Sequence, residues 1–212
     1  MNLVERRIKL EISRLYLCTG VWDGGAQLER FLEAVLSSGV DIVQMREKAA
    51  PQNDRREAAR VFRRLTDTHA ALFIINDDPN LAASSDADGV HLGQEDMPPE
   101  KAREILGDEF LIGRSTHSPE ELDRALDEPV DYLGVGPVNE TPTKPGRKGV
   151  GLDYVSYAAH NSTKPFFVTG GMSTETMPDV LEAGATRVVV VRALTEAADP
   201  ATAAKELRAL LL

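Results

Sequence analysis

The chain has 212 residues, of which 42% are hydrophobic and 27% charged, and its formal net charge is −10. This length fits one sizeable domain, and the two fractions are those of a globular protein. The negative charge argues against broad binding to nucleic acids or anionic membranes, so we expect neither as a partner. An anionic substrate would need a local cluster of basic side chains.

Cysteine content and hydropathy bear on the compartment. Cys18 is the only cysteine, which excludes an internal disulfide bond, and its apolar neighbours predict a small core residue. Residues 1–12 carry scattered charges and lack the apolar core of a signal peptide. The apolar run Val188–Val191 is too short to cross a bilayer. These features predict a cytoplasmic protein.

Short apolar segments alternate with helical patterns along most of the chain. The predicted strands are Leu15–Cys18, Val40–Lys48, Leu72–Ile75, Gly89–Leu92, Phe110–Gly113, Tyr132–Val135, Phe166–Val168 and Arg187–Val191. The predicted helices are Gln27–Leu36, one capped by Asn53 or Asp54 and ending near Thr68, one beginning at Asp78-Pro79, Pro98–Leu106, one beginning with a capping box at Ser118, one capped by Ser173, and Ala201–Leu211.

The alternation defines the fold class. Without hairpin turns it predicts a parallel sheet, and eight strand–helix units predict that the sheet closes. We therefore predict an α/β protein, a single-domain (β/α)8 TIM barrel over residues 14–212. An open doubly wound sheet is the alternative, but it would normally have fewer strands, and no Gly-x-Gly-x-x-Gly follows the first strand. The lead-in, residues 1–13, fits a helix or a strand.

The stretch Val40–Lys48 begins apolar and ends polar. Gln44, Arg46 and Lys48 alternate along it, so in an extended chain they point to one side. Barrels and open α/β sheets keep their sites at the carboxyl ends of strands. Two cations and an amide at such an end suit a polyanion such as a diphosphate, while a solvated strand end paired with nearby acids is the alternative.

Acidic residues follow the third and fourth strands. Asn76 and Asp77 come directly after Ile75, and Asp96 lies shortly after the fourth strand. Asp96 has an alternative role as the cap of the following helix. If Asp77 and Asp96 converge beside a diphosphate, they suit Mg²⁺, which keeps waters and takes one or two protein carboxylates plus phosphate oxygens. We therefore expect Mg²⁺ at these two residues.

The later strand ends carry further polar groups. Ser115 could donate to an anion, while Thr116 and His117 fit ordinary loop residues. No Asp/His/Ser spacing resembles that of a hydrolase, and the four histidines lack the spacing of a zinc site. His91, within a predicted strand, is expected in the core or at the rim.

A long loop runs from Gly136 to about Gly151 and contains two hydroxyl residues and a lysine, Thr141, Thr143 and Lys144. Its length favours a phosphate clamp or a lid over a plain turn-rich loop. Gly170-Gly171 would let backbone N–H groups approach a ligand, and many barrels bind phosphate at this corner. A second anion site is therefore expected near the last three strands.

Together these motifs resemble the thiamine-phosphate synthase family. The resemblance covers the chain from Arg14 onward and is carried by Gln44–Lys48, Asn76-Asp77, Gly89–Asp96, Gly136-Pro137 with Thr141–Lys144, and Gly170-Gly171. Each motif alone is weak, but five in order at the expected strand ends are specific. The family joins 4-amino-2-methyl-5-(diphosphomethyl)pyrimidine to 4-methyl-5-(2-phosphoethyl)thiazole, and diphosphate leaves before the thiazole nitrogen attacks.

The resemblance also implies roles for individual residues. The pyrimidine diphosphate would be held by Gln44, Arg46, Lys48, Asn76, Ser115 and Lys144, of which Arg46, Lys48, Ser115 and Lys144 would act in catalysis. Mg²⁺ would be held by Asp77 and Asp96. The thiazole phosphate would be held by Thr141, Thr143, Gly171, Val191 and Arg192. Arg192 departs from the small hydroxyl residue expected there in many members, and it binds the phosphate only if its guanidinium points at the rim.

Other functions remain open. A thiazole tautomerase on the same barrel would move a proton with a histidine such as His117. A Schiff-base aldolase would use Lys48 or Lys144, and a non-catalytic phosphate-binding barrel is the third alternative. A homo-oligomer is compatible with the sequence.

Overall fold

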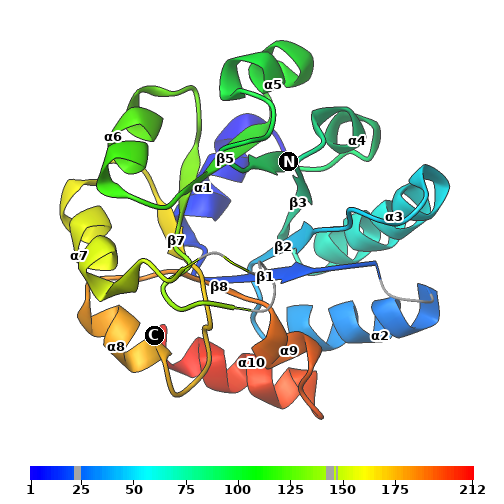
Figure 1. The fold of residues 1–212 in the computed structure, drawn as a ribbon. Coiled ribbons are helices and arrows are strands. Elements are labelled where there is room, and N and C mark those ends of the chain that lie inside the picture. The colour runs from blue at the N-terminus through cyan, green and yellow to red at the C-terminus, as the bar shows by residue number, and fades with distance from the viewer. Residues whose placement is uncertain (22–24, 142–145, 147) are drawn as a thin grey trace.

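Parallel strands close into a ring with helices around it in the computed structural model, which describes residues 1–21, 25–141, 146 and 148–212 (Figure 1). The strands are β1 (Leu15–Thr19), β2 (Ile42–Met45), β3 (Leu72–Asn76), β4 (Gly89–Leu92), β5 (Leu111–Thr116), β6 (Tyr132–Val135), β7 (Phe166–Val168) and β8 (Val188–Val190). Each strand pairs with the next in sequence, and β8 pairs with β1. The predicted TIM barrel is confirmed.

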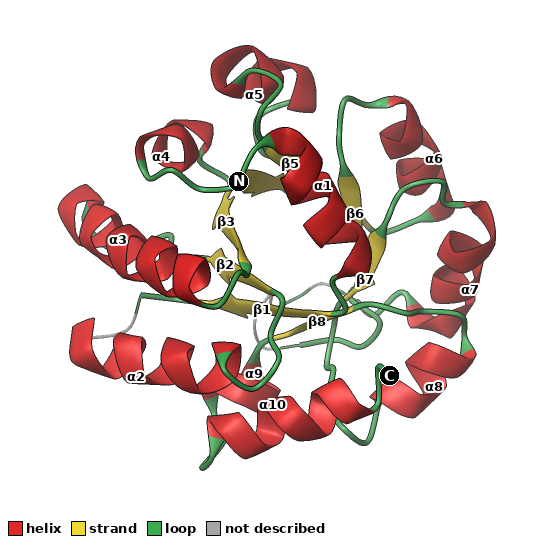
Figure 2. Ribbon diagram, turned by 180° about the vertical axis from the view of Figure 1, so that it is seen from behind, coloured by secondary structure: helices red, strands yellow, loops and turns green. Residues whose placement is uncertain are grey.

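Most of the helices surround the outside of the ring, and α1 lies across one of its ends (Figure 1, Figure 2). The helices are α1 (Leu3–Ile12), α2 (Gly25–Leu36), α3 (Gln52–Thr68), α4 (Pro79–Ser84), α5 (Pro99–Leu106), α6 (Pro119–Asp127), α7 (Gly151–Asn161), α8 (Met177–Glu182), α9 (Arg192–Thr195) and α10 (Pro200–Ala209). Among the described helices, none is both long and apolar enough to span a bilayer.

Two apolar clusters form the core because strand side chains alternate between the two faces of the sheet. The larger cluster fills the space between the ring and the helices; Leu17, Val43 and Phe73 are among its fully buried members. The smaller one lies inside the ring and includes Tyr16, Tyr132 and Phe167 with Leu10 of α1. The inward positions are therefore aromatic or aliphatic low in the barrel, which leaves the upper positions for polar groups.

The lead-in segment forms helix α1, which lies across one end of the ring (Figure 2). Its basic side chains reach acids that precede three alternate strands: Arg6 Nε lies 3.0 Å from Asp88 Oδ1, and Arg7 Nη2 lies 2.9 Å from Asp131 Oδ1. Lys9 similarly faces Asp41 at 3.9 Å. Since these acids precede β4, β6 and β2, α1 covers the amino-terminal end of the barrel and leaves the carboxyl end open.

Several predicted boundaries need correction. β5 extends to Thr116 rather than ending at Gly113, because Ser115 and Thr116 continue the ladder opposite Gly134 and Val135 of β6. β2 ends at Met45, so the polar half of the predicted strand lies beyond it. Helices α7 and α9 were not among the predicted helices.

Helix starts were predicted with mixed success. Asp78 caps α4 and Ser118 caps α6, as expected, although the Glu121 carboxylate accepts from the His117 N–H rather than closing a capping box. The predicted caps Asn53, Asp54 and Ser173 are wrong. Helix α3 begins after Pro51, and α8 begins only after Thr176 because the chain turns first over residues 170–176.

Candidate active site

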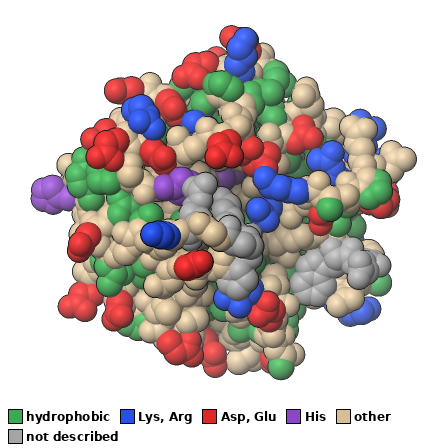
Figure 3. Space-filling model, in the orientation of Figure 1, with side chains coloured by type: hydrophobic (Ala, Val, Ile, Leu, Met, Phe, Trp, Pro, Cys, Tyr) green, Lys and Arg blue, Asp and Glu red, His purple; other side chains and the backbone are tan. Residues whose placement is uncertain are grey.

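A cavity of about 440 Å³ opens at the carboxyl ends of the strands. All the predicted site residues within the described part of the chain line it, namely Gln44, Arg46, Lys48, Asn76, Asp77, Asp96, Ser115, Thr141, Gly171, Val191 and Arg192. Thr143 and Lys144 lie outside the described residues. In Figure 3, Lys and Arg side chains lie near the middle of the same face, although acidic side chains are common around its edge. The structure thus brings together residues that lie far apart in the sequence.

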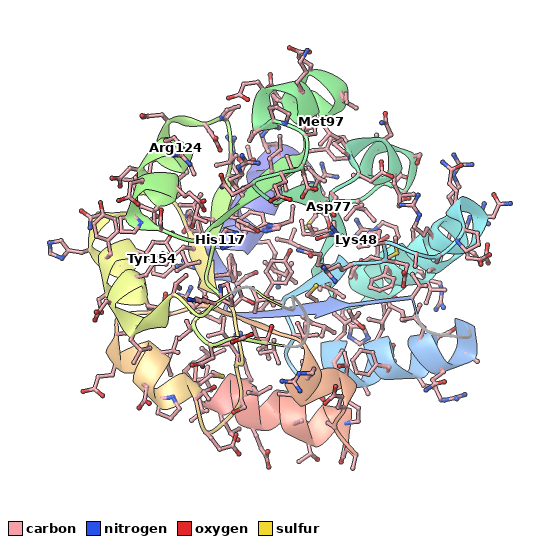
Figure 4. All side chains as sticks on the ribbon, viewed as in Figure 1. Lys48, Asp77, Met97, His117, Arg124 and Tyr154 are labelled. Carbon is pink, nitrogen blue, oxygen red and sulfur yellow. The ribbon has the colours of Figure 1, made fainter. Side chains whose placement is uncertain are left out.

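The basic side of the cavity is built by β2 and the residues after it. Gln44 is an inward-facing strand residue and is 5% exposed, while Arg46 and Lys48 follow the strand end. Lys48 Nζ lies 2.7 Å from Asp77 Oδ2, and Figure 4 shows the two side chains close together. Lys48 therefore reaches across from the end of β2 to the end of β3 and places its positive charge within the cavity.

Asp77 directly follows β3 in a backbone conformation that non-glycine residues rarely adopt. Its φ is +64°, in the left-handed region, where such strain often marks a functional position. Burial raises the pKa of the Asp77 carboxyl, the neighbouring Asp96 carboxyl raises it further, and Lys48 lowers it. The two acids therefore converge as predicted, and their mutual repulsion disfavours the ionised pair when no cation lies between them.

Asp96 does not cap a helix. Its Oδ2 accepts a hydrogen bond from the Gly93 N–H at 2.7 Å, whereas α5 begins after Pro98 without any side-chain cap. The alternative reading of Asp96 as a helix cap is thus wrong. The Gly93 N–H instead fixes this carboxylate beside Asp77, at the rim.

The acid pair suits a magnesium ion better than a zinc ion. Within the described ranges there is no group of three or more His, Cys, Asp or Glu side chains arranged to hold a metal. Mg²⁺ needs fewer protein ligands, since waters and substrate phosphate oxygens complete its shell. Asp77 and Asp96 are the residues that would hold it.

The opposite side of the cavity is formed after β7 and β8. Gly170 has φ +108°, and a Cβ there would lie 2.4 Å from the Val138 nitrogen, so glycine is required where the two loops meet. Gly171, Val191 and Arg192 line the cavity beside it. Arg192 is the first residue of α9 and contributes to the cavity wall, which puts this cation on the rim.

Several residues of the cavity floor were not predicted from the sequence, namely Tyr16, Cys18, Tyr132 and Phe167. His91, which was expected in the core or at the rim, lines the cavity with them from β4. Cys18 is buried, as predicted, but it faces the inside of the barrel rather than the outer core. The sequence contains a pattern that could have identified these residues. Each lies two positions from another inward-facing residue of its strand, so counting alternate residues along the predicted strands would have found them.

His117 also lines the cavity, across the ring from Lys48 in Figure 4. Its Nδ1 is hydrogen-bonded to the Gly136 carbonyl oxygen, and its backbone N–H donates to Glu121 Oε2 at 2.8 Å. Since a carbonyl can only accept, Nδ1 carries the proton. His117 is therefore held by two specific contacts rather than being an ordinary loop residue.

A closed (β/α)8 barrel whose open rim gathers cations, paired carboxylates and glycine-rich loops has the architecture of a TIM-barrel enzyme. Residues 15–194 match the family model described as thiamine monophosphate synthase. The chain belongs to this family, as its sequence motifs predicted.

Curated relatives named thiamine-phosphate synthase support this assignment. The protein of Thermobifida fusca is 49% identical over 205 residues, which are 95% of this chain and 94% of that protein. The protein of Acidothermus cellulolyticus is 46% identical, with 97% and 98% covered. The protein of Thermosynechococcus vestitus is 44% identical over 98% of this chain, but this chain spans only 58% of its length.

Comparison with solved structures gives two further likenesses. Thiamine phosphate pyrophosphorylase from Pyrococcus furiosus has a TM-score of 0.84 at 33% identity, covering 97% of this chain and 96% of that chain. A 3-hexulose-6-phosphate synthase has a TM-score of 0.65 at 21% identity, covering 94% and 100%. The second likeness shows the shared barrel fold alone.

Proposed function

We propose that this protein is a thiamine-phosphate synthase that joins 4-amino-2-methyl-5-(diphosphomethyl)pyrimidine to 4-methyl-5-(2-phosphoethyl)thiazole, giving thiamine monophosphate and diphosphate. The observation that carries the proposal is the single cavity lined by eleven of the predicted site residues, from Gln44 on β2 to Arg192 on α9. One side of this cavity carries basic side chains and a pair of acids, and the other side is rich in glycine, which would provide a place for each of two phosphorylated substrates.

The diphosphate would lie on the basic side, between the ends of β2 and β3. Arg46 and Lys48 would neutralise the charge that grows on the diphosphate as its bond to carbon breaks, and this charge is larger in the transition state than in the substrate. Lys48 is positioned for this role by its 2.7 Å contact with Asp77. Lys144, outside the described residues, would add a third cation.

Asp77 and Asp96 would hold Mg²⁺. When bound, the ion would supply positive charge to the leaving diphosphate oxygens. The raised pKa of Asp77, caused by burial and by Asp96, supports this assignment because a cation between the carboxylates would relieve the cost of ionising both.

The pyrimidine ring would lie deeper, over the floor that Tyr16, Tyr132 and Phe167 form. Aromatic rings at this depth exclude water from the reacting carbon, and Gln44 and Ser115 at the edge of the floor would orient the ring. The thiazole nitrogen already has a lone pair, so its attack needs no general base. Gly171, Arg192 and Thr141 would hold the thiazole phosphate on the other side of the cavity.

The function is tested by a coupled assay for diphosphate release, run with both substrates, with each alone, and with Mg²⁺ or EDTA. We expect steady release only with both substrates and Mg²⁺. Release of diphosphate at the same rate from the pyrimidine substrate alone would contradict synthesis, because it would indicate a hydrolase.

The same preparation separates the rival functions. A tautomerase using His117 would convert the thiazole substrate alone, without Mg²⁺. A Schiff-base aldolase would be trapped by borohydride in the presence of substrate. Lys48 is ion-paired with Asp77 and its side chain is 59% exposed, unlike the desolvated amine that Schiff-base formation favours, so we expect no trapping.

A further inference from the structure

A chain of side-chain hydrogen bonds crosses the inside of the barrel beneath the cavity. Gln44 Nε2 donates to the Tyr16 hydroxyl at 2.7 Å, and this hydroxyl lies 3.1 Å from the Tyr132 hydroxyl. The Tyr132 hydroxyl lies 3.2 Å from His91 Nδ1, and His91 Nε2 lies 2.9 Å from Ser115 Oγ. The chain therefore joins Gln44 on β2 to Ser115 on β5.

Counting the protons assigns a donor-to-acceptor direction to this chain of hydrogen bonds. The Tyr16 hydroxyl accepts from Gln44, so its own proton goes to the Tyr132 oxygen, its remaining partner in the chain. Tyr132 in turn donates its proton to His91 Nδ1. The proton of the neutral imidazole is then on Nε2, which donates to Ser115 Oγ, and the serine is left with a proton to give.

We propose that Tyr16, Tyr132 and His91 are positioning residues that make the Ser115 hydroxyl a hydrogen-bond donor toward the bound substrate. The proposal deepens the proposed function, because Ser115 lines the cavity that would receive the pyrimidine diphosphate. A substrate acceptor atom at Ser115 would be bound without a hydroxyl reorientation. The same chain fixes the Gln44 amide, whose Oε1 accepts from the Cys18 thiol at 3.3 Å.

Packing keeps the members of the chain in place. A Cβ on Gly113 would lie 2.5 Å from His91 Nδ1 and 2.2 Å from Tyr132 Cζ, so a glycine is needed where these two rings meet on β5. The ring centroids of Tyr132 and Phe167 lie 5.7 Å apart in an edge-on contact. Burial raises the pKa of both the Tyr16 and Tyr132 hydroxyls above the ordinary value for tyrosine, so both hydroxyls carry their protons at physiological pH.

The opposite direction would have different consequences. It requires the Gln44 amide to be turned over, so that its oxygen accepts from Tyr16 and each later proton points toward β2. His91 would then carry its proton on Nδ1, and Ser115 would donate to His91 instead of to a substrate. The tautomer of His91 therefore reports the direction.

The first test is the His91 tautomer in the wild-type protein without substrates. Two-bond ¹H–¹⁵N correlation spectra of uniformly ¹⁵N-labelled protein distinguish the two tautomers, and a His91→Gln variant assigns the signals. We expect protonated Nε2 and unprotonated Nδ1. A proton on Nδ1, or a rapidly exchanging mixture, would overturn the proposal, and this measurement does not depend on the enzymatic activity.

The second test is a double-mutant cycle on diphosphate release. Tyr132→Phe removes the hydroxyl that bonds to His91 and should lower kcat/KM about tenfold or more, whereas the same change in a Ser115→Ala background should have little further effect. Additive losses would overturn the proposal, since they would show that Tyr132 acts without Ser115.

Tyr154→Phe is the matched control. Tyr154 on α7 is also buried and donates to Thr116 Oγ1 at 2.7 Å, but it lies outside the ring and does not line the cavity (Figure 4). We expect its kcat/KM to be unchanged within about twofold. Equal losses in both variants would show a general effect of buried tyrosine hydroxyls and overturn the proposal. If the wild-type protein is inactive but His91 is protonated at Nε2, the synthase function is refuted, whereas the donor-to-acceptor direction of the hydrogen-bond chain is established.

Discussion

Asp77 is the residue where backbone conformation, charge and the proposed chemistry coincide. It has a φ of +64°, it pairs with Lys48, and burial together with Asp96 raises the pKa of its carboxyl. Such a group is costly when ionised in the free protein. The cost is understandable if the carboxylate serves a cation that arrives with the substrate.

Replacing Asp77 by Asn should therefore separate stability from activity. Asn tolerates the left-handed conformation and carries no charge, so we expect the free energy of unfolding in EDTA to equal or exceed that of the wild type. Turnover should fall by about two orders of magnitude or more because the metal would lose a ligand. Urea denaturation and the diphosphate assay measure the two effects.

The pH dependence of this difference has a definite sign. Between the ordinary carboxyl pKa, about 3.9, and the raised value in the fold, the native state of the wild type holds more protons than the unfolded state. Its stability therefore falls as pH rises through that window, and the Asp77→Asn variant lacks this loss. The advantage of the variant should disappear at acid pH.

Asp78→Asn is the control for the removed charge. Asp78 caps α4 by accepting from the Leu81 N–H at 3.0 Å, which Asn can also do, and it does not line the cavity. We expect near-normal turnover. A loss as large as that of Asp77→Asn would show that general charge, not metal binding, explains both results.

At the scale of elements, ion pairs between α1 and the acidic residues that precede β4 and β6 stabilise the amino-terminal end of the barrel. Asp88, just before β4, is 0% exposed and accepts from the Phe73 N–H at 2.8 Å, while Arg6 and Arg63 each approach it to 3.0 Å. Asp131 repeats the arrangement with the Ile112 N–H and two arginines. Helix α1 is thereby joined to alternate strands of the ring.

Asp88→Ala should lower the free energy of unfolding by about 3–5 kcal/mol, since it leaves buried cationic and N–H groups without their acceptor. The control, Glu57→Ala, removes an exposed pair with Arg60 and should cost less than about 1 kcal/mol. Chemical denaturation of both variants measures the difference. Equal effects would mean that the Asp88 pairs contribute no more than a surface contact.

At the scale of the whole molecule, an acidic protein places the basic side chains proposed to bind substrate at one cavity. The net charge is −10, yet Arg46, Lys48 and Arg192 all line the rim. The barrel makes this possible because strand ends that are distant in sequence share one edge. Ligands that bridge the cavity should therefore stabilise the entire domain.

Inorganic diphosphate and Mg²⁺ together should raise the melting temperature by about 5–10 °C at roughly one hundred times their dissociation constant. Each alone should give a smaller shift, because Mg²⁺ would take its remaining ligands from the diphosphate. Thermal melts of wild type and the Asp77→Asn variant measure this. A shift with both ligands that is no larger than the sum of the separate shifts would argue against a shared site.

The part of the structure that could be predicted from the sequence also differs between the fold and the boundaries of its elements. The barrel and most strand positions followed from short apolar runs separated by helical patterns, since hydrophobic periodicity is a local property. Boundaries failed where neighbours decide them: β5 continues through Ser115 because β6 lies alongside, and α8 starts late because the preceding glycine-rich turn packs against another loop. A sequence pattern does not contain these contacts.

The family, the closed parallel barrel and the predicted site residues that line the cavity could be predicted from residue types in their order along the chain. Three features became known only from the folded structure. Asp96 lies beside Asp77 instead of capping α5, and α1 closes the amino-terminal end of the barrel. Inside the barrel, hydrogen bonds through Tyr16, Tyr132 and His91 link Gln44 to Ser115. Those facts depend on distances between strands, and such distances exist only once the ring has closed.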